Sequence, residues 1–379
     1  MNRFSVAFLL VCYTLTTAVP ATPQRKHPDK ESILEVMRRT NNYFMNKWPD
    51  VGKRIVTNRD RASNIWTRAV YYEGLMALYK LDPNPQYHDY AIRWGDFHKW
   101  DLRDGDTYTR NADNQCAGQT YIDLFALDKN PIRIEKIKAS VDSMMRTDKI
   151  DDWTWVDAIQ MAMPVFAKLG VACKEPSYFD RMFEMYIHTR NVEGGNGLFN
   201  PRDNLWWRDK DFVPPYKEPN GEDCYWARGN GWVVAALVRV LETIPKDEKH
   251  RKQYEADFIA MIKAIAVLQR DDGFWNVSLH DPSHLSGKET TGTSLFIYGL
   301  AWGINNGYLD AREFKPVALR AWNAVVKDAV HADGFLGYVQ GTGKEPADGQ
   351  PVTYSSMPDF EDYGLGCFLL AGSEMYKLK

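Results

Sequence analysis

The sequence predicts an all-helical protein assembled from antiparallel pairs of helices. Apolar residues recur at intervals of three or four along most of the chain, which is the spacing of one helical face. Most of these periodic segments are separated by short stretches, and short connections make neighbouring helices antiparallel. Little length remains for a sheet, so the predicted fold class is all-α.

The spacing predicts about twelve helical segments, with ends placed to within a few residues. They lie near residues 30–48, 62–81, 86–99, 114–128, 131–147, 154–169, 176–190, 229–244, 250–270, 290–307, 311–329 and 361–377. The apolar face is clearest for Ile33, Met37, Phe44 and Trp48, for Ile134, Ile137, Val141 and Met144, and for Tyr254, Phe258, Met261, Ile265 and Leu268. Pro85, Pro131 and Pro176 stand near the starts of three segments, where the absent N–H group has no helical partner to lose.

Three longer stretches lack helical spacing, at residues 191–228, 271–289 and 331–360. Loops of this length in a compact domain are usually functional. We expect the three to gather at one mouth of the helical array. No linker divides residues 22–379, which are expected to form a single domain.

Composition limits the partners of the protein. The chain has 379 residues, of which 44% are hydrophobic, and a formal net charge of −3. Without a block of Lys or Arg, neither nucleic acid nor an anionic membrane is an expected partner. The 13 Trp and 20 Tyr are numerous; flat rings suit sugar faces, and a large aromatic core is the alternative interpretation.

The first 21 residues have the pattern of a secretory signal peptide. Arg3 precedes an apolar run from Phe4 to Leu15, and Val19-Pro20-Ala21 offers a cleavage site. No later apolar run is long enough to span a bilayer, so we expect soluble export, to the periplasm, without membrane insertion.

Four cysteines remain after the signal peptide, and no two of them form a CxxC pair. A zinc site is therefore not expected. Four widely spaced cysteines in a large domain favour thiols over a disulfide scaffold.

Asp157 is the first candidate for chemistry. It lies in the first turn of an otherwise apolar helix, where the helix dipole favours a carboxylate. If Trp153, Trp155 and Met161 desolvate it, its pKa rises and it can hold a proton as a general acid. The alternative is a carboxylate bonded only to backbone N–H groups of its helix.

Asp113 is the second candidate, just before the helix predicted near 114–128. Two carboxylates in one site matter because one ionised group makes its neighbour harder to ionise, which separates acid and base roles. A simple helix N-cap is the alternative for Asp113.

The third candidate is the segment from Trp226 to Trp232, which opens a helix. Arg228 offers a planar fork suited to a carboxylate. Glycines on either side of Asn230 allow the close approach of a ligand or of another backbone. Trp232 can floor a sugar subsite. The alternative is a close helix crossing with Arg228 in a structural ion pair.

Weaker candidates are polar or aromatic residues on the second helix and in the three long loops. They are Trp66, Tyr72, Trp206, Trp207, Arg208, His280, His284, Glu289, Gln340 and Tyr354. The absence of HExxH, P-loop and nucleophile-elbow patterns argues against metalloprotease, nucleotide-binding and serine-hydrolase functions.

The strongest of these motifs resemble glycoside hydrolase family 105, which is related to family 88. The segment from Trp226 to Trp232 resembles its WxRGNGW signature, and the run around Asp157-Ala158 and Met161-Ala162 resembles its catalytic helix start. The Asp113 segment fits it as well, as do Asp272-Gly273-Phe274-Trp275, Glu289-Thr290-Thr291-Gly292-Thr293-Ser294 and Leu300-Ala301-Trp302-Gly303-Ile304. The similarity covers most of the chain after the signal peptide.

The resemblance implies an (α/α)6 barrel of six helix hairpins. It also implies removal of the 4,5-unsaturated uronic acid that polysaccharide lyases leave at a non-reducing end. An Asp protonates C4 of the vinyl ether and water adds at C5, after which the sugar opens and releases its neighbour. Asp157 is then the acid/base residue and Asp113 its partner, with no metal or organic cofactor. The implied substrate-binding residues are Arg228, Trp232, Trp226, Asn230, Trp66, Tyr72, Trp206 and Arg208.

The sequence departs from the family at one place. Some members carry a His-Gly-Trp element where this chain has Leu205-Trp206-Trp207-Arg208-Asp209, without a His. Arg208 or a Trp is expected to take the place of that His, which can alter substrate preference.

Other functions stay open at this level. Another (α/α)6 enzyme, such as an endo-glycosidase or a sugar epimerase, is one alternative, and a non-catalytic glycan-binding protein is another. Rhamnogalacturonan fragments from pectin are the default substrate of the family, with ulvan and glycosaminoglycan products as alternatives. The sequence leaves the oligomeric state undecided.

Overall fold

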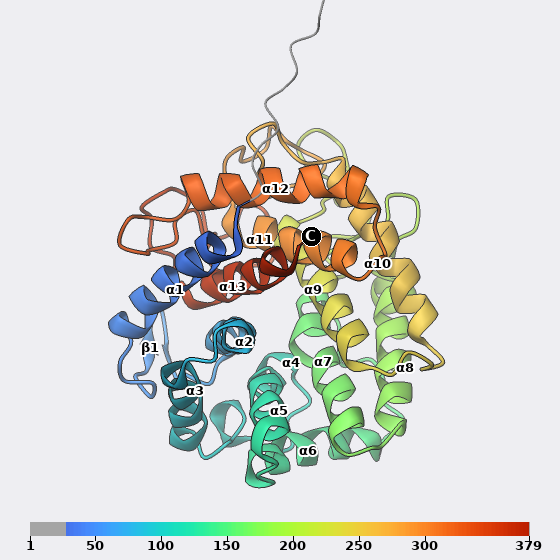
Figure 1. Ribbon diagram of the computed structural model, residues 1–379. Coiled ribbons are helices and arrows are strands. Elements are labelled where there is room, and N and C mark those ends of the chain that lie inside the picture. Colours follow the sequence, from blue (N-terminus) through green and yellow to red (C-terminus); the bar gives the residue numbers. More distant parts are fainter. Residues whose placement is uncertain (1–27, 379) are drawn as a thin grey trace, which may run out of the picture.

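The computed structural model describes residues 28–378 (Figure 1), so the predicted signal peptide lies outside the described residues. The α-helices are Lys30–Lys47 (α1), Trp66–Leu81 (α2), Pro85–Phe97 (α3), Ala112–Gln115 (α4), Ala117–Asp128 (α5), Ile132–Met145 (α6), Val156–Ala172 (α7), Ser177–Asn191 (α8), Ala227–Thr243 (α9), Arg251–Ala266 (α10), Thr290–Asn305 (α11), Ala311–Asp328 (α12) and Asp362–Lys377 (α13). Two antiparallel pairs of short strands, Ile55–Val56 (β1) with Asp60–Arg61 (β2) and Phe199–Asn200 (β3) with Leu205–Trp206 (β4), lie in loops, and each of the short 3-10 helices η1 (Arg103–Gly105) and η2 (Glu193–Gly195) is a single turn.

The inner helices form a closed ring. Around it, α2, α5, α7, α9, α11 and α13 each contact the next, and α13 returns to α2. Outside this ring, α3, α6, α8, α10 and α12 each pack on the inner helix that precedes them in the chain, and α1 packs on α13. This is the (α/α)6 barrel that the resemblance implies, and the all-helical prediction is confirmed.

The pattern of apolar residues decides which helices lie inside. Every residue of α11 from Thr290 to Gly303 is buried, as expected for a helix enclosed on all sides. In contrast, α12 buries one stripe that includes Phe314, Ala318 and Trp322, and its remaining faces meet solvent. Inner and outer positions therefore follow from the width of each apolar face.

The predicted segments match the helices closely, except that one predicted segment forms two helices. The segment predicted near 114–128 begins at Ala112 and is split at Cys116 into α4 and α5. The Asn111 side chain starts this unit by accepting a bond from the Asn114 N–H group, at 3.3 Å. Because the helix begins earlier than the apolar spacing suggests, Asp113 falls inside its first turn.

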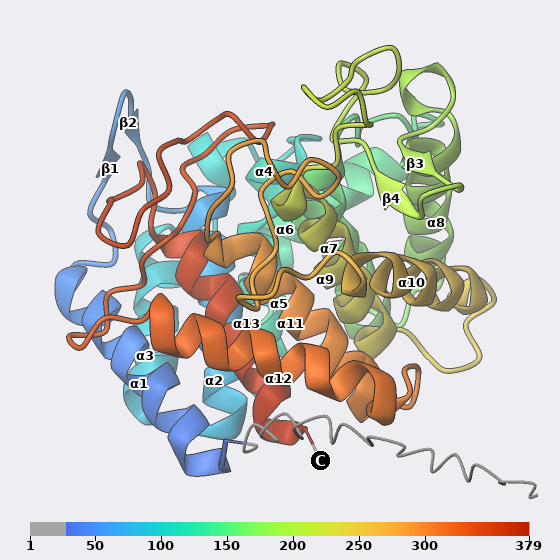
Figure 2. The same ribbon diagram turned by 90° about the horizontal axis from the view of Figure 1, so that it is seen from above.

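The long loops all lie at one end of the barrel (Figure 2). Each of them leads from an outer helix into an inner one, whereas the connections out of the inner helices are short, such as residues 82–84 and 129–131. The Trp226 indole donates to Gln340, and Glu218 contacts His284, so the three predicted loops touch one another. Their gathering at one mouth is confirmed, and the N-termini of the inner helices point there.

The ring closes where α2 meets α13. A Cβ atom built on Gly366 would lie 2.2 Å from the carbonyl oxygen of Val70, and one on Gly74 would lie 2.6 Å from the carbonyl oxygen of Gly366. A buried ion pair between Arg68 and Asp362, at 2.9 Å, joins the same two helices. Glycine is therefore required for the backbones to approach this closely.

Two further properties of residues 28–378 bear on the sequence expectations. The four cysteines in this part of the chain are free thiols. None of the helices between residues 28 and 378 combines the length and the apolar character needed to cross a bilayer.

We expect Gly366→Ala to lower the free energy of unfolding by about 1–3 kcal/mol, because the added methyl group must push α2 away from α13. Urea denaturation followed by circular dichroism measures this change. Gly287→Ala is the matched control, since a Cβ atom on Gly287 meets nothing within 4 Å. Equal losses for the two variants would contradict the close crossing.

Candidate active site

The mouth of the barrel collects charged and aromatic side chains from the first turns of the inner helices. They are Trp66 at the start of α2, Asp113 in α4, Asp157 in α7, Arg228 in α9, Glu289 as the N-cap of α11 and Asp362 in α13. Helix N-termini stabilise negative charge, so a ring of them favours carboxylates at this end.

Asp157 lies in the first turn of α7 and is held by Arg208. The Arg208 Nε group donates to Asp157 Oδ2 at 3.1 Å, and the Asp157 side chain is only 11% exposed. The backbone places this arginine, because the Val156 N–H group donates to the Arg208 carbonyl at 2.9 Å. A guanidinium at this distance stabilises the negative charge of the carboxylate.

Asp113 lies near enough to Asp157 for their charges to interact. The pKa of Asp113 is raised to about 7, mainly by burial and also by the charge of Asp157, whereas the charges of Arg208 and Arg103 act in the opposite direction. The N-cap of this helix is Asn111, so Asp113 is not a simple cap. The raised pKa of Asp113 was not among the sequence expectations.

Arg228 is buried and holds the loop of residues 331–360. Its Nη1 group donates to the carbonyl oxygen of Gln340 at 3.1 Å, and its Nη2 group donates to that of Gly341 at 2.9 Å. The guanidinium also stacks on the Trp226 ring, at 4.4 Å from its centroid. Among residues 28–378 its Nε group has no hydrogen-bond partner, and no carboxylate forms the ion pair considered as an alternative.

The aromatic residues Trp66 and Trp232 meet at the mouth. Their ring centroids are 6.3 Å apart in an edge-to-face arrangement, and Trp66 also packs on Tyr363 at 5.3 Å. Trp66 is partly exposed, whereas Trp232 is buried with an indole N–H group that has no partner in the described part of the chain. Trp66 therefore presents a ring surface, and Trp232 presents an unused donor.

The Asn230 side chain bonds to backbone groups of the barrel. Its Oδ1 atom accepts from the Trp206 N–H group at 2.8 Å, and its Nδ2 group donates to the carbonyls of Trp206 and Trp226. These bonds fix β4 to the start of α9. A Cβ atom on Gly231 would lie 2.9 Å from Leu295, so this glycine allows α9 and α11 to cross closely. A contact between Asn230 and substrate stays a prediction.

Two predicted aromatic contacts lie in the core. Tyr72 is fully buried and stacks on Trp94 at 4.1 Å, between an inner and an outer helix. Trp206 is also fully buried, and its indole donates to the Met261 sulfur at 3.2 Å. Six residues of helix separate Tyr72 from Trp66, which places Tyr72 about 9 Å deeper. The contribution of Tyr72 and Trp206 to substrate binding stays a prediction.

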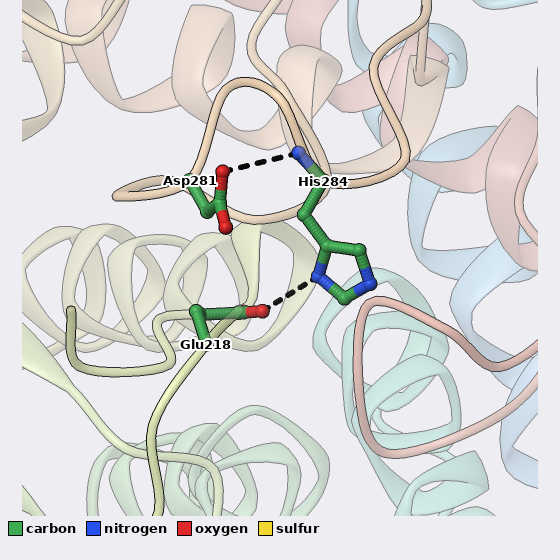
Figure 3. Close-up of side chains that lie close together, drawn as sticks. All are labelled: Glu218, Asp281 and His284. Atoms are coloured by element: carbon green, nitrogen blue, oxygen red, sulfur yellow. Dashed lines mark hydrogen bonds and ion pairs between the residues drawn. The ribbon is translucent and has the colours of Figure 1, made fainter. Parts of the chain in front are cut away.

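Among residues 28–378, one group of side chains has the composition of a metal site. Glu218, Asp281 and His284 bring their ligand atoms within 4.8 Å of one another (Figure 3). Hydrogen bonds already occupy them: Glu218 contacts His284 Nδ1 at 2.6 Å and accepts from the Ser278 hydroxyl at 2.8 Å, while Asp281 accepts from the His284 N–H group at 3.1 Å. This group joins two mouth loops.

A large cavity lies at the opposite end of the barrel, away from Asp113 and Asp157. It has a volume of about 720 Å3 and is lined by the last turns of inner helices, with Lys168, Arg239 and Glu242 among its walls. We place the active site at the mouth, because the interacting carboxyl pair lies there.

Sequence reasoning missed Tyr363 and Arg103. The Tyr363 hydroxyl donates to the Gln340 carbonyl, and its ring packs on Trp66. Arg103 lowers the pKa of Asp113 from the loop before α4. No local pattern marks either residue, since both act through partners distant in the chain.

Comparison with known proteins identifies the family. The sequence profile of Glycosyl Hydrolase Family 88 matches residues 36–379. The chain is 33% identical over 336 residues to the unsaturated 3S-rhamnoglycuronyl hydrolase of Formosa agariphila, covering 83% of this chain and 85% of the relative.

Two solved structures are similar over nearly the whole chain. A family 88 glycosyl hydrolase from Bacteroides vulgatus is 33% identical with a TM-score of 0.84, covering 93% of this chain and 100% of that one. A protein described as a polysaccharide lyase is 32% identical with a TM-score of 0.83, covering 92% and 97%. The profile match extends over most of the sequence and includes Asp113, Asp157 and Arg228, and on this ground the chain belongs to glycosyl hydrolase family 88.

Proposed function

We propose that this glycoside hydrolase removes the 4,5-unsaturated uronic acid from the non-reducing end of lyase-generated oligosaccharides. The observation that carries the proposal is the pair Asp113 and Asp157 at the mouth. One member has a pKa raised to about 7, and the other is bound by an arginine. A carboxyl group with such a pKa can give or take a proton near neutral pH, which suits acid and base chemistry beside a second carboxyl group.

The reaction needs one carboxylic acid and one carboxylate. The acid gives its proton to C4 of the vinyl ether, and water adds at C5 while the carboxylate takes the proton of that water. The product is a hemiketal, which opens to a ketone and releases the neighbouring sugar as an alcohol. The family resemblance makes Asp157 the acid/base residue and Asp113 its partner.

Binding of the uronate uses the donors that the fold leaves unused. Arg228 Nε and the Trp232 indole N–H group are buried without partners in the described residues, and an unpaired buried donor costs free energy that a ligand oxygen can restore. The partly exposed ring of Trp66 offers a flat surface for the sugar. Trp226 supports the Arg228 guanidinium from beneath.

We propose a rhamnose that carries a 3-sulfate as the sugar released. Support comes from the name of the Formosa relative, an unsaturated 3S-rhamnoglycuronyl hydrolase. The replacement of the family's His by Arg208 next to Asp157 is consistent with a more anionic substrate than the rhamnogalacturonan fragments expected by default. We also propose export to the periplasm, on the pattern of residues 1–21.

We expect the wild type to abolish the ultraviolet absorbance of the C4=C5 double bond in lyase-generated oligosaccharides. Asp157→Asn should lower kcat by about 10²–10⁴-fold or more with substrate binding retained, because the amide cannot exchange a proton. Asp148→Asn, at an exposed site, is the matched control. A rise in absorbance on intact polymer would instead identify a lyase, and unchanged activity of Asp157→Asn would exclude its catalytic role.

The pH profile of kcat/KM should report the titration of Asp113. Because the pKa of Asp113 is raised to about 7, its protonated form is present below that pH and is lost as the pH rises through it. We expect kcat/KM to fall about tenfold per pH unit above this point. The residual activity of Asp113→Asn should lack this alkaline limb. If the alkaline fall in kcat/KM persists unchanged in Asp113→Asn, the fall is caused by another group.

A substrate panel tests the sulfate. We expect unsaturated uronyl-rhamnose with a 3-sulfate to have a kcat/KM at least about tenfold above that of the desulfated compound, a difference of about 1.4 kcal/mol in transition-state binding. Products of rhamnogalacturonan and glycosaminoglycan lyases complete the panel. Equal rates with and without sulfate would overturn the proposed substrate and leave the reaction class in place.

A further inference from the structure

The cavity at the end of the barrel opposite the mouth has the size of a ligand site. Its volume is about 720 Å3, and small-molecule sites occupy roughly 300–1,000 Å3. The last turns of inner helices surround it, from Lys80 in α2 to Lys377 in α13. Apolar side chains such as Met76 and Ile122 alternate with charged ones in its walls. A small polar molecule of sugar size can therefore be enclosed there.

Positive charge is in excess among the described residues that line this cavity. Seven of them are Lys or Arg, and four are Asp or Glu. Three of the cations have a carboxylate partner: Lys168 with Asp123 at 2.7 Å, Arg239 with Glu73 at 3.7 Å, and Lys377 with Glu374. Within residues 28–378, Glu242 is thus the one carboxylate of the lining that forms no ion pair.

Four cations of the lining form no ion pair with any residue between 28 and 378. These outer lysines are all exposed, and they are Lys80, Lys129, Lys174 and Lys246. Set against the single carboxylate of Glu242, they leave a surplus of positive charge around the cavity. Such a surplus raises the local concentration of anions.

Arg239 brings an unused donor to the wall of the cavity. The residue is 7% exposed, and its Nε group donates to Gln119 Oε1 at 2.9 Å. Its Nη2 group has no hydrogen-bond partner in the described part of the chain, and Asp123 Oδ2 lies 4.0 Å away. A buried donor without a partner costs free energy, and the oxygen of an anion would restore it with a charge-assisted bond.

The ends of the inner helices account for the outer lysines in part. A helix C-terminus favours cations, and Lys80 lies in the last turn of α2 while Lys129 is the C-cap of α5. Arg239 and Lys168 instead lie a full turn before the ends of α9 and α7, where this effect has declined. A different reason is needed for these two inner cations.

The inner cations also repel each other. Burial and, after it, the charge of Arg239 lower the pKa of Lys168 to about 8, even though Asp123 bonds to this lysine. Burial raises the pKa of Glu73, which lessens the negative charge opposite Arg239. An anion near Arg239 and Lys168 would relieve their repulsion.

We infer that this cavity is a second ligand site, which binds a phosphate-like oxyanion with two negative charges, either free or carried on a molecule of sugar size. Arg239 Nη2 meets the oxyanion, and Lys80 and Lys246 balance its remaining charge from outside. An arginine and lysines are the side chains best suited to such a group. The site lies apart from the mouth, and its existence does not depend on the proposed hydrolysis.

Isothermal titration calorimetry of the full chain tests the site with three probes: inorganic phosphate, glucose 6-phosphate and uncharged glucose. Arg239→Gln removes the inner donor, and the double variant Lys80→Gln/Lys246→Gln removes two exposed charges without touching the core. Arg208→Gln removes a cation at the mouth. Lys252→Gln, at an exposed position of α10 outside the cavity lining, is the matched control.

We expect one saturable site for at least one phosphate probe and none for glucose. Arg239→Gln should raise Kd by about tenfold or more, because it removes a hydrogen bond between charged groups. The double variant should raise Kd by about threefold or more, since exposed charges are partly screened. Arg208→Gln and Lys252→Gln should match the wild type. Tighter binding of glucose 6-phosphate than of inorganic phosphate identifies a carried group, and equal or weaker binding identifies the free oxyanion.

Three results would overturn the inference. They are the absence of saturable binding of both phosphate probes, binding that is lost in Arg208→Gln and kept in the double variant, and a loss of affinity in Lys252→Gln equal to that in the double variant. The first removes the ligand, the second moves it to the mouth, and the third makes it a nonspecific effect of surface charge. The double variant keeps the test valid if Arg239→Gln fails to fold, because both of its lysines are exposed.

Discussion

The structure depends on the closure of six inner helices into a ring. The last contact of that ring, between α2 and α13, requires glycine at Gly74 and Gly366 because the backbones lie too close for a side chain. Once the ring is closed, the inner helices are parallel, and their first turns meet at one end. The site is therefore assembled from residues far apart in sequence, including Trp66, Asp157 and Arg228.

Two arginines at the mouth have different roles. Both Nη groups of Arg228 donate to backbone carbonyls of the last loop, and so Arg228 shapes the wall of the site. Arg208 faces a carboxylate and acts on its charge. Both are partly or fully desolvated, and an arginine keeps its charge under these conditions because its pKa lies far above neutrality. The site thus combines a fixed positive wall with a pair of carboxyl groups, one of which has a pKa raised to about 7.

Most of the architecture could be predicted from the sequence, because helical spacing and loop length are local signals. The pairing of Asp113 with Asp157 was predicted from the motifs. The raised pKa of Asp113 was not, since it depends on burial and on the charge of Asp157, 44 residues further along the chain. The full burial of Tyr72 and Trp206 could not be predicted, because residue type does not report depth along a helix or distance from a barrel axis. Asn230 lies within the signature segment, yet its hydrogen bonds go to the backbone.

The division between long loops at the mouth and short turns at the far end has an evolutionary consequence. Insertions and deletions between an outer helix and the next inner helix, such as those at 267–289 or 329–361, change the rim of the site without altering the register of the ring. The barrel and its substrate range can therefore diverge at different rates. Relatives that share Asp113 and Asp157 are free to differ in the sugars they accept.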